Sequence, residues 1–192
     1  MRAKNTQEIL LKTATTLFAQ KGYPDTSIRD IGARASISSS IIYHYFKNKE
    51  EILFTIIYNE SQDLIKTLLE IEGRISDPVK CLREMLKEQS IIYSLKGKKV
   101  GKILAFDSHQ LRGKRGEIIR KLQYDIYDIY KTKIQEIKDK KLLRDDIDLT
   151  VLTFSIFGII NSFHGWYKNS GRLSEEEVAE NMERFLFNGI LK

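Results

Sequence analysis

The chain has 192 residues, 42% of them hydrophobic and 30% charged, a composition that suits a soluble globular protein. Its single cysteine, Cys81, excludes an internal disulfide and fits a reducing cytoplasm, the expected location. The N-terminus lacks the apolar run of a signal peptide, and polar residues interrupt the short apolar segment 149–163, so no membrane span is expected. The net charge is +6, and residues 1–50 alone hold eight Lys/Arg against four Asp/Glu. This basic excess suits contact with phosphates.

The first predicted helix covers about residues 6–21, where apolar side chains recur at helical spacing. Residues 26–46 then predict two short helices joined by a tight turn. Thr26 or Ser27 can cap the first of them, and Ser38 can cap the second, because a hydroxyl there accepts from free N–H groups. Two short helices at a steep angle form a helix-turn-helix, whose second helix can enter the major groove of DNA.

The later elements are also predicted to be helices. Asn48 and Glu51 form a capping box for a helix that reaches about residue 72, and Asp77 caps another. Further helices are expected near 103–106, over 117–140, from Asp146 or Asp148 to about 167, and from the Ser174–Glu177 capping box to Gly189. The sequence therefore predicts an all-α protein of about nine helices.

The residues of the helix-turn-helix and of the helix before it follow a known pattern. Its positions are filled here by Ala14, Leu17, Phe18, Gly22, Thr26, Ile31, Ala35, Ser38, Tyr43, Phe46 and Lys49. Because of this pattern, residues 7–53 resemble the N-terminal DNA-binding domain of TetR/AcrR-type transcriptional regulators. Two positions depart from it, because Ser36 replaces the usual turn glycine and Gly32 a usual alanine. If residue 36 needs a positive φ, serine carries a cost that glycine avoids.

The resemblance implies a dimeric, ligand-controlled transcriptional repressor that binds a palindromic double-stranded operator. Residues 1–53 would be the DNA-binding domain, and residues 54–192 the effector-binding and dimerisation domain. The expected DNA contacts are Thr26, Ser27, Arg29, Ser38, Ser39, Ser40, Ile41, Tyr43, His44 and Lys49. Structural roles compete at several of them: Ser38 can serve as a cap, Tyr43 can pack on the first helix, and Arg29 can pair with Asp30.

A looser resemblance covers about thirty residues near the C-terminus. It rests on Asn161, Trp166, Tyr167, Gly171, Leu173, Ser174, Glu176, Glu177, Ala179, Phe185, Leu186 and Gly189. These residues resemble a subgroup that commonly answers to acyl-CoA thioesters, so the small-molecule effector is expected to be an acyl-CoA or a related thioester. A multidrug-responsive regulator of an efflux gene is the alternative.

The residues expected to bind this effector are Tyr93, Phe106, His109, Arg112, Tyr124, Tyr127, Phe157 and Trp166. Their aromatic rings could line an apolar pocket, although an ordinary helical core competes with that interpretation for each ring. Two Lys/Arg clusters, at 96–102 and 112–121, could hold the phosphates of CoA, or could simply be solvated surface charge.

The dimer is expected to form through an apolar face on the last two helices, which comprises Leu152, Ile156, Ile159, Ile160, Phe163 and Phe185. No metal site or catalytic site is expected, because His109 and His164 lack partners at metal spacing and no nucleophile–base pair is visible. A small helical enzyme and a helical small-molecule-binding protein without DNA function remain the other interpretations.

Overall fold

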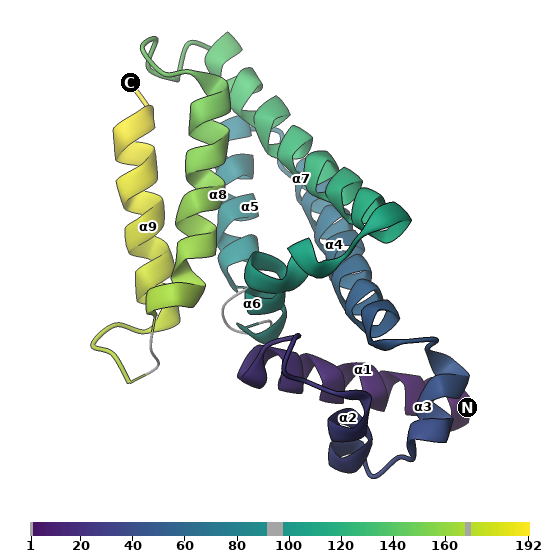
Figure 1. The fold of residues 1–192 in the computed structure, drawn as a ribbon. Helices are drawn as coiled ribbons and strands as arrows, with labels where there is room; N and C mark the ends of the chain where they lie inside the picture. The colour runs from purple at the N-terminus through teal and green to yellow at the C-terminus, as the bar shows by residue number, and fades with distance from the viewer. Residues whose placement is uncertain (1, 92–97, 168–169) are drawn as a thin grey trace. The chain divides into compact units, whose positions relative to one another are not determined.

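A computed structural model describes residues 2–91, 98–167 and 170–192. Within these ranges the protein is all-α, as the sequence predicts, apart from a short 3₁₀ turn and an isolated bridge between Leu143 and Leu191 (Figure 1). The helices are α1 (Arg2–Lys21), α2 (Ile28–Ala35), α3 (Ser39–Tyr45), α4 (Lys49–Arg74), α5 (Pro78–Ile91), α6 (Lys98–Asp107), the 3₁₀ turn η2 (Ser108–Gln110), α7 (Gly113–Asp139), α8 (Leu149–Trp166) and α9 (Glu175–Ile190). None of the described helices is long and apolar enough to cross a membrane.

The chain forms two compact units. The first combines residues 1–61 with residues 99–122, and the second combines residues 62–98 with residues 123–192. Helices α4 and α7 therefore contribute to both. The unit that contains the predicted helix-turn-helix also includes α6 and the start of α7, while the expected domain boundary after residue 53 stays a prediction.

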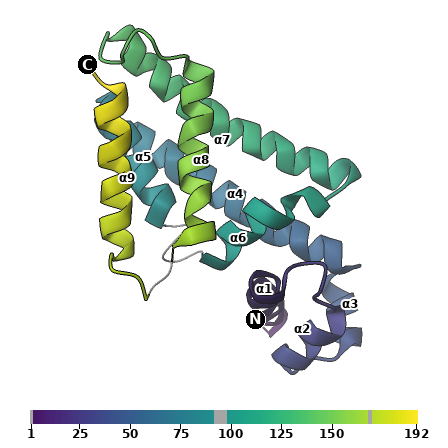
Figure 2. The ribbon, with the colours of Figure 1, turned by 60° about the vertical axis from the view of Figure 1, so that its left-hand side comes forward.

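The first unit is organised around α1, α2 and α3 (Figure 2). Leu10, Ala14 and Phe18 recur along α1 at helical spacing, and each is at most 1% exposed. Ile31 of α2 and Ile42 of α3 are fully buried as well. These side chains form the core that fixes the position of α3.

Caps at the helix starts confirm most of the predicted boundaries. Ser27 and Ser174 each take part in a capping box, with Asp30 and Glu177 respectively. Asp77 and Asp148 accept the backbone N–H groups of Lys80 and Val151, both three residues on. At the start of α4, Asn48 accepts the N–H of Glu51, but the Glu51 carboxylate accepts the N–H of Lys47 rather than that of Asn48.

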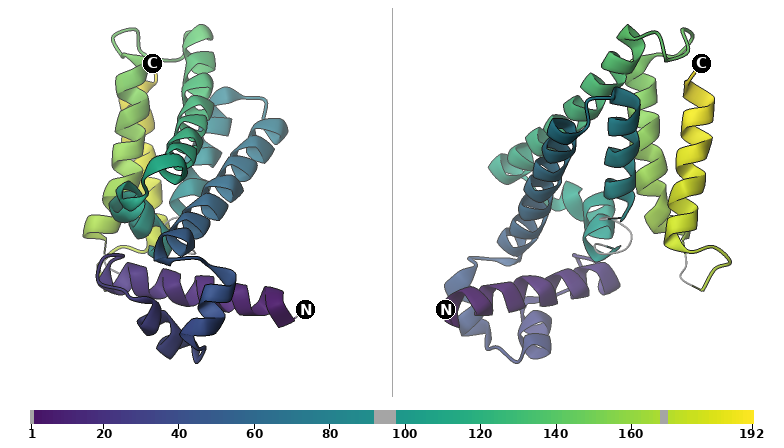
Figure 3. Two further views of the ribbon diagram at one scale, coloured as in Figure 1. Left: turned by 45° about the vertical axis from the view of Figure 1, so that its right-hand side comes forward. Right: turned by 180° about the vertical axis from the view of Figure 1, so that it is seen from behind.

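The second unit contains α5, α8, α9 and most of α7 (Figure 3). Within it, α5 packs against α9. The Tyr130 side chain on α7 is fully buried, and its hydroxyl lies 2.5 Å from Oε1 of Gln89 and 3.2 Å from the carbonyl oxygen of Met85. The Phe157 ring meets the Tyr130 ring edge-on, with 5.3 Å between centroids. These contacts bind α5, α7 and α8 into one core.

Candidate nucleic-acid interface

Helix α3 presents one buried side and one exposed side. Ile42 is fully buried and anchors the helix, whereas Ser40, Ile41, Tyr43 and His44 are exposed. Ile41 and Tyr43, at 46% and 56% exposure, are large side chains that the protein does not cover. A short helix that shows hydroxyl, apolar and aromatic groups together has the chemistry needed to contact base edges and phosphates.

The three consecutive serines at the start of α3, Ser38, Ser39 and Ser40, have different roles. The Ser38 hydroxyl accepts the N–H of Ile41 at 3.4 Å, so this side chain serves as the N-cap. Ser39 is half-buried and Ser40 is exposed, and both stand in the first turn of α3. Ser39 and Ser40 are therefore the serines whose hydroxyls are not used as a cap.

The turn between α2 and α3 brings together the two departures from the family pattern. Ser36 has φ 57° and ψ 39°, the left-handed conformation that favours glycine. The N–H of Ile37 then donates to the carbonyl of Gly32 at 2.9 Å. A Cβ atom on Gly32 would lie 2.6 Å from the carbonyl oxygen of Ile37, which leaves no room for an alanine. Gly32 therefore permits the close approach of the backbone in this turn. Ser36 carries backbone strain in the same turn, because it is a non-glycine residue in the left-handed conformation.

The predicted contacts on α2 have different surroundings. Thr26 is 1% exposed and its hydroxyl donates to the carbonyl of Gly22, so this side chain braces the loop before α2. Ser27 caps α2. Arg29 is exposed and forms no ion pair with any described residue; Asp30 instead lies 3.8 Å from Lys21. Arg29 is thus the predicted α2 residue with an unpaired charge.

Lys49, the first residue of α4, points back toward the loop between α1 and α2. Its ammonium donates to the carbonyls of Tyr23 and Pro24, at 2.8 Å and 3.1 Å, and lies 4.3 Å from the centre of the Tyr23 ring. Burial lowers the pKa of Lys49 below its usual value. The sequence predicts a phosphate contact for Lys49. In the structure its ammonium group instead has hydrogen-bond partners within the protein.

Helix α6 is bonded to the first helix of this unit, which the sequence did not indicate. Lys99 donates to the hydroxyl of Thr16 at 3.0 Å, and Lys102 donates to the carbonyl of Ala19 at 2.8 Å, in the last turn of α1. A cation at the carboxyl end of a helix also interacts favourably with the helix dipole. Part of the predicted 96–102 Lys/Arg cluster is thus bonded to α1, and residues 96 and 97 lie outside the described residues.

Two further groups from this segment contact the region around α1 and α4. The carboxylate of Asp107 accepts the backbone N–H of Tyr23. Burial raises the pKa of Asp107 above its usual value, despite that bond and the nearby basic side chains of His109, Lys102 and Lys49. The guanidinium of Arg115 lies 3.8 Å from the carboxylates of Glu50 and Glu51, at the start of α4.

The predicted effector residues are spread over both units. Tyr93 lies outside the described residues, and Phe106 belongs to α6. His109 and Arg112 are exposed in the first unit. In the second unit, Tyr124 and Trp166 are 66% and 52% exposed, whereas the partly buried rings of Tyr127 and Phe157 stack with 6.4 Å between centroids.

The predicted dimerisation residues also divide into two groups. Leu152, Ile156 and Ile160 are at most 5% exposed, so they already pack within their own chain. Ile159 is half-buried, and the side chain of Phe163 is not among those described. Phe185 is 74% exposed. Val151 and Phe154 of α8, which are not among the predicted dimerisation residues, are 64% and 61% exposed.

Comparisons with known proteins agree with this geometry. Residues 10–56 match bacterial regulatory proteins of the tetR family, and residues 76–190 match the tetracyclin repressor-like C-terminal domain. The HTH-type transcriptional repressor KstR2 of Mycolicibacterium smegmatis is 28% identical over 191 residues, which cover 94% of this chain and 88% of that repressor.

Two solved structures share the fold. AibR in complex with isovaleryl coenzyme A and operator DNA has a TM-score of 0.86 and 27% identity, over 95% of this chain and 98% of AibR. The ketosteroid transcriptional regulator KstR2 of Mycobacterium tuberculosis has a TM-score of 0.89 at 21% identity, over 97% of this chain and 95% of that one.

The matched residues include both the helix-turn-helix and most of the chain that follows it, and the full-length relatives are transcriptional regulators rather than enzymes. The chain therefore belongs to the tetR family of bacterial regulatory proteins and is a ligand-responsive, DNA-binding transcriptional regulator.

Proposed function

We propose that this regulator is a dimeric cytoplasmic repressor that leaves a palindromic operator when it binds an acyl-CoA or a related acyl thioester. The observation that carries the proposal is the likeness to AibR along nearly the whole of both chains, because AibR was solved with isovaleryl coenzyme A and operator DNA. The similarity to the repressor KstR2 over 94% of this chain supports repression as the outcome.

The DNA contacts are assigned to the exposed side of α3. The hydroxyls of Ser39 and Ser40 can bond to several bases, and the Ile41 side chain can pack against a thymine methyl. Tyr43 and His44 are exposed near the end of the same helix and suit contacts to phosphate. Arg29 adds an unpaired positive charge from α2.

The partner surface is assigned to the outward sides of α8 and α9. Val151, Phe154 and Phe185 are large apolar side chains with more than half of their surface exposed, which a second copy would cover. Gly158 lies on α8 with Val151 and Phe154 and is exposed. No atom lies close to the position that a Cβ atom would take there, so a partner helix could approach closely. The two identical helix-turn-helix units of such a dimer would match an operator with two-fold symmetry.

Effector binding releases DNA only if it favours a state that binds the operator less tightly. The bonds from Lys99, Lys102 and Asp107 to α1 and to Tyr23 offer a physical route, because any shift of α6 must stretch or break them. These bonds lie within the first unit, which also carries α3. Displacement of α6 would therefore act on the helix-turn-helix itself.

The positive charges left for the phosphates of CoA lie in the 112–121 cluster. Arg112, Lys114 and Lys121 are exposed, and none forms an ion pair with a described residue, whereas Arg115 is engaged by Glu50 and Glu51. Phosphate binding by these exposed cations would be salt-dependent.

The proposal is tested by titrating the protein–operator complex with a series of acyl chain lengths, each as free acid and as CoA thioester. Apolar burial contributes about 0.8 kcal/mol per CH₂, so potency should rise with chain length until the cavity is filled. The thioester should be more potent than the acid, and the difference should shrink in high salt. Release by planar cationic drugs, with no response to any thioester, would assign the protein to the multidrug-responsive regulators instead.

A further inference from the structure

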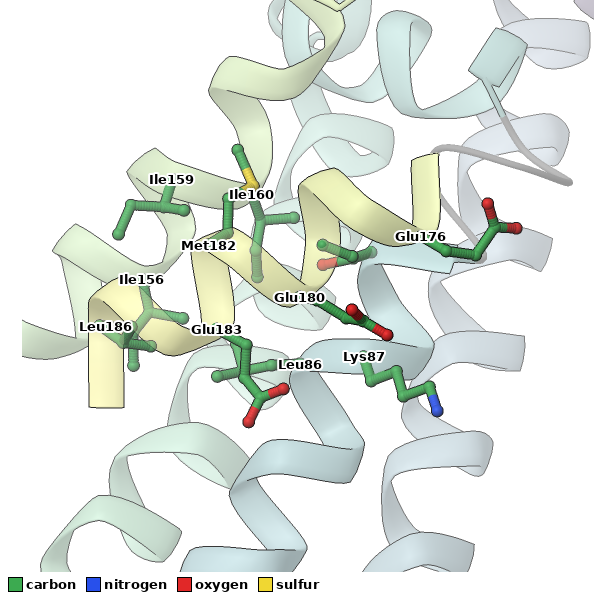
Figure 4. A pocket seen from close by; sticks show the side chains of 12 residues that line it. Leu86, Lys87, Ile156, Ile159, Ile160, Glu176, Glu180, Met182, Glu183 and Leu186 are labelled. Atoms are coloured by element: carbon green, nitrogen blue, oxygen red, sulfur yellow. The ribbon is translucent and has the colours of Figure 1, made fainter. Parts of the chain in front are cut away.

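A groove between α5, α8 and α9 lies in the second unit and has two chemically different sides (Figure 4). Its volume is about 230 Å³, and none of the predicted effector residues whose side chains the structure describes lines it. The side chains of Ile156, Ile159, Ile160, Met182 and Leu186 gather on the α8 side, while Glu176, Glu180 and Lys87 gather on the other (Figure 4).

The acidic side of the groove comes from one stripe of α9. Glu176, Glu180 and Glu183 recur at spacings of four and three, so they project from the same face of the helix. Glu183 is paired with Arg83, whose guanidinium is also held over the Phe187 ring at 4.0 Å. Glu176 and Glu180 form no ion pair with any described residue.

The charge of the lining is negative, because Arg83 offsets Glu183 and the carboxylates of Glu176 and Glu180 then outnumber the single ammonium of Lys87. Burying an apolar body against the isoleucines and Met182 would remove apolar surface from water. A positive head group would then lie beside Glu176 and Glu180. An apolar cavity of about 150 Å³ is enough to hold a benzene molecule, so this groove has room for a somewhat larger body.

The groove and the surface assigned to the second copy involve different residues of α8 and α9. On α9, Phe185 is 74% exposed while its neighbour Leu186 lines the groove and is 7% exposed. On α8, Val151 is exposed, whereas Ile156 and Ile160, five and nine residues on, turn inward. At about 100° per residue, Ile156 and Ile160 lie about 140° and 180° from Val151 around α8, and Leu186 lies about 100° from Phe185 around α9, so the groove and the surface assigned to the second copy use different sides of both helices.

We propose that this groove is a second small-molecule site, which binds an amphiphilic cation: an ammonium head beside Glu180 and Glu176 and a short apolar body against α8. Its charge preference is opposite to that of the proposed thioester site. A hydrophobic ammonium would enter it, whereas the carboxylate of the same chain length would be repelled by the glutamates.

The test uses the full chain, without DNA or thioester, so its outcome is independent of the proposed function. The probes are hexylammonium, hexanol and hexanoate, which share one apolar chain and differ in charge. The reporter is the methyl group of Met182 in NMR spectra of protein labelled at its three methionines. Met85, which is fully buried and does not line the groove, is the internal reference.

Hexylammonium is expected to shift the Met182 signal and leave Met85 unmoved, with hexanol about fivefold weaker, as for the loss of a partly exposed ion pair. Glu180→Gln should weaken hexylammonium by a similar factor without changing hexanol. Glu70→Gln, at an exposed glutamate on α4 of the same unit, should change neither. Ala179→Leu should block hexylammonium and hexanol alike, because the larger side chain fills the groove. If Ala179→Leu does not fold, the comparison of Glu180→Gln with the wild type still tests the proposal.

Equal or tighter binding of hexanoate would overturn the proposal, as would a Met182 signal unmoved at millimolar hexylammonium. A Met182 shift that follows protein concentration alone would overturn it too, because a second copy would then occupy the groove.

Discussion

The Nζ atom of Lys49 lies 2.8 Å from the carbonyl oxygen of Tyr23 and 4.3 Å from the centre of the same residue's ring. A side chain at the start of α4 thereby fixes the loop that joins α1 to α2. Because the ammonium also bonds to the carbonyl of Pro24, its charge is committed within the protein.

Lys49→Ala is expected to lower the free energy of unfolding by about 1–2 kcal/mol, because bonds to a charged donor are lost. Operator affinity should fall by the same factor for every DNA sequence, while the slope of log affinity against log salt stays unchanged. Lys47→Ala, at an exposed lysine two residues earlier, is the control for stability. A slope reduced by about one per protomer would instead identify Lys49 as a phosphate contact.

Asp107 should make the stability of the protein depend on pH in a defined direction. Its folded-state pKa is raised, first by burial, so the folded protein holds this proton more tightly than the unfolded chain does. The stabilisation that protonated Asp107 provides is fully present below the ordinary carboxyl pKa. It is lost as the pH rises through the raised pKa of Asp107 in the folded protein.

Asp107→Asn retains an oxygen that can accept the N–H of Tyr23, and removes the buried charge. The variant should be more stable than the wild type at neutral pH, and the advantage should shrink toward the ordinary carboxyl pKa. Thermal unfolding across this range measures it, with Asp63→Asn on the exposed surface of α4 as the control. An advantage that grows at low pH would reverse the sign and contradict the assignment.

The turn between α2 and α3 predicts opposite effects at two neighbouring positions. Ser36→Gly should raise the free energy of unfolding by about 0.5–1 kcal/mol, since it relieves a left-handed non-glycine residue at some cost in chain entropy. Gly32→Ala should lower it by about 1–3 kcal/mol, because the new Cβ meets the Ile37 carbonyl at 2.6 Å. Urea unfolding measures both, and an alanine tolerated at position 32 would disprove the close turn.

The dimer surface is tested at side chains that are exposed within one protomer. Phe185→Glu and Val151→Glu should shift the protein toward monomer in sedimentation at micromolar concentration and remove operator binding, while Leu69→Glu, at an exposed leucine on α4, should do neither. Ile156→Glu would instead destabilise the fold, because that side chain is 1% exposed and cannot hold a charge. A dimer unaffected by both surface variants would require another interface.

Local signals in the sequence predicted much of this structure, because helix caps depend on neighbours three residues away. Ser27, Ser38 and Ser174 all cap helices where expected. The short helix expected at 103–106 is longer in the structure, where α6 begins at Lys98. Periodicity identified the apolar face there, and the flanking lysines, which are good helix formers, extend the helix beyond that face.

Contacts between distant segments could not be predicted in this way. The bond from Lys102 to Ala19 joins residues 83 positions apart, and nothing in either local pattern indicates the other. Helix α8 shows the same limit, because it has apolar residues on more than one side. Periodicity alone could not distinguish Ile156, which faces its own chain, from Val151, which is exposed.

The central claim is that the exposed side of α3 reads an operator in two equivalent copies. Selection from a pool of random DNA fragments tests it most directly, carried out in parallel with the wild type and with Ser40→Ala. The wild type should enrich a palindrome of two half-sites, and Ser40→Ala should change the preferred base at one position in each half-site. No enriched sequence, or the same sequence with unchanged base preference in both selections, would contradict this assignment of α3.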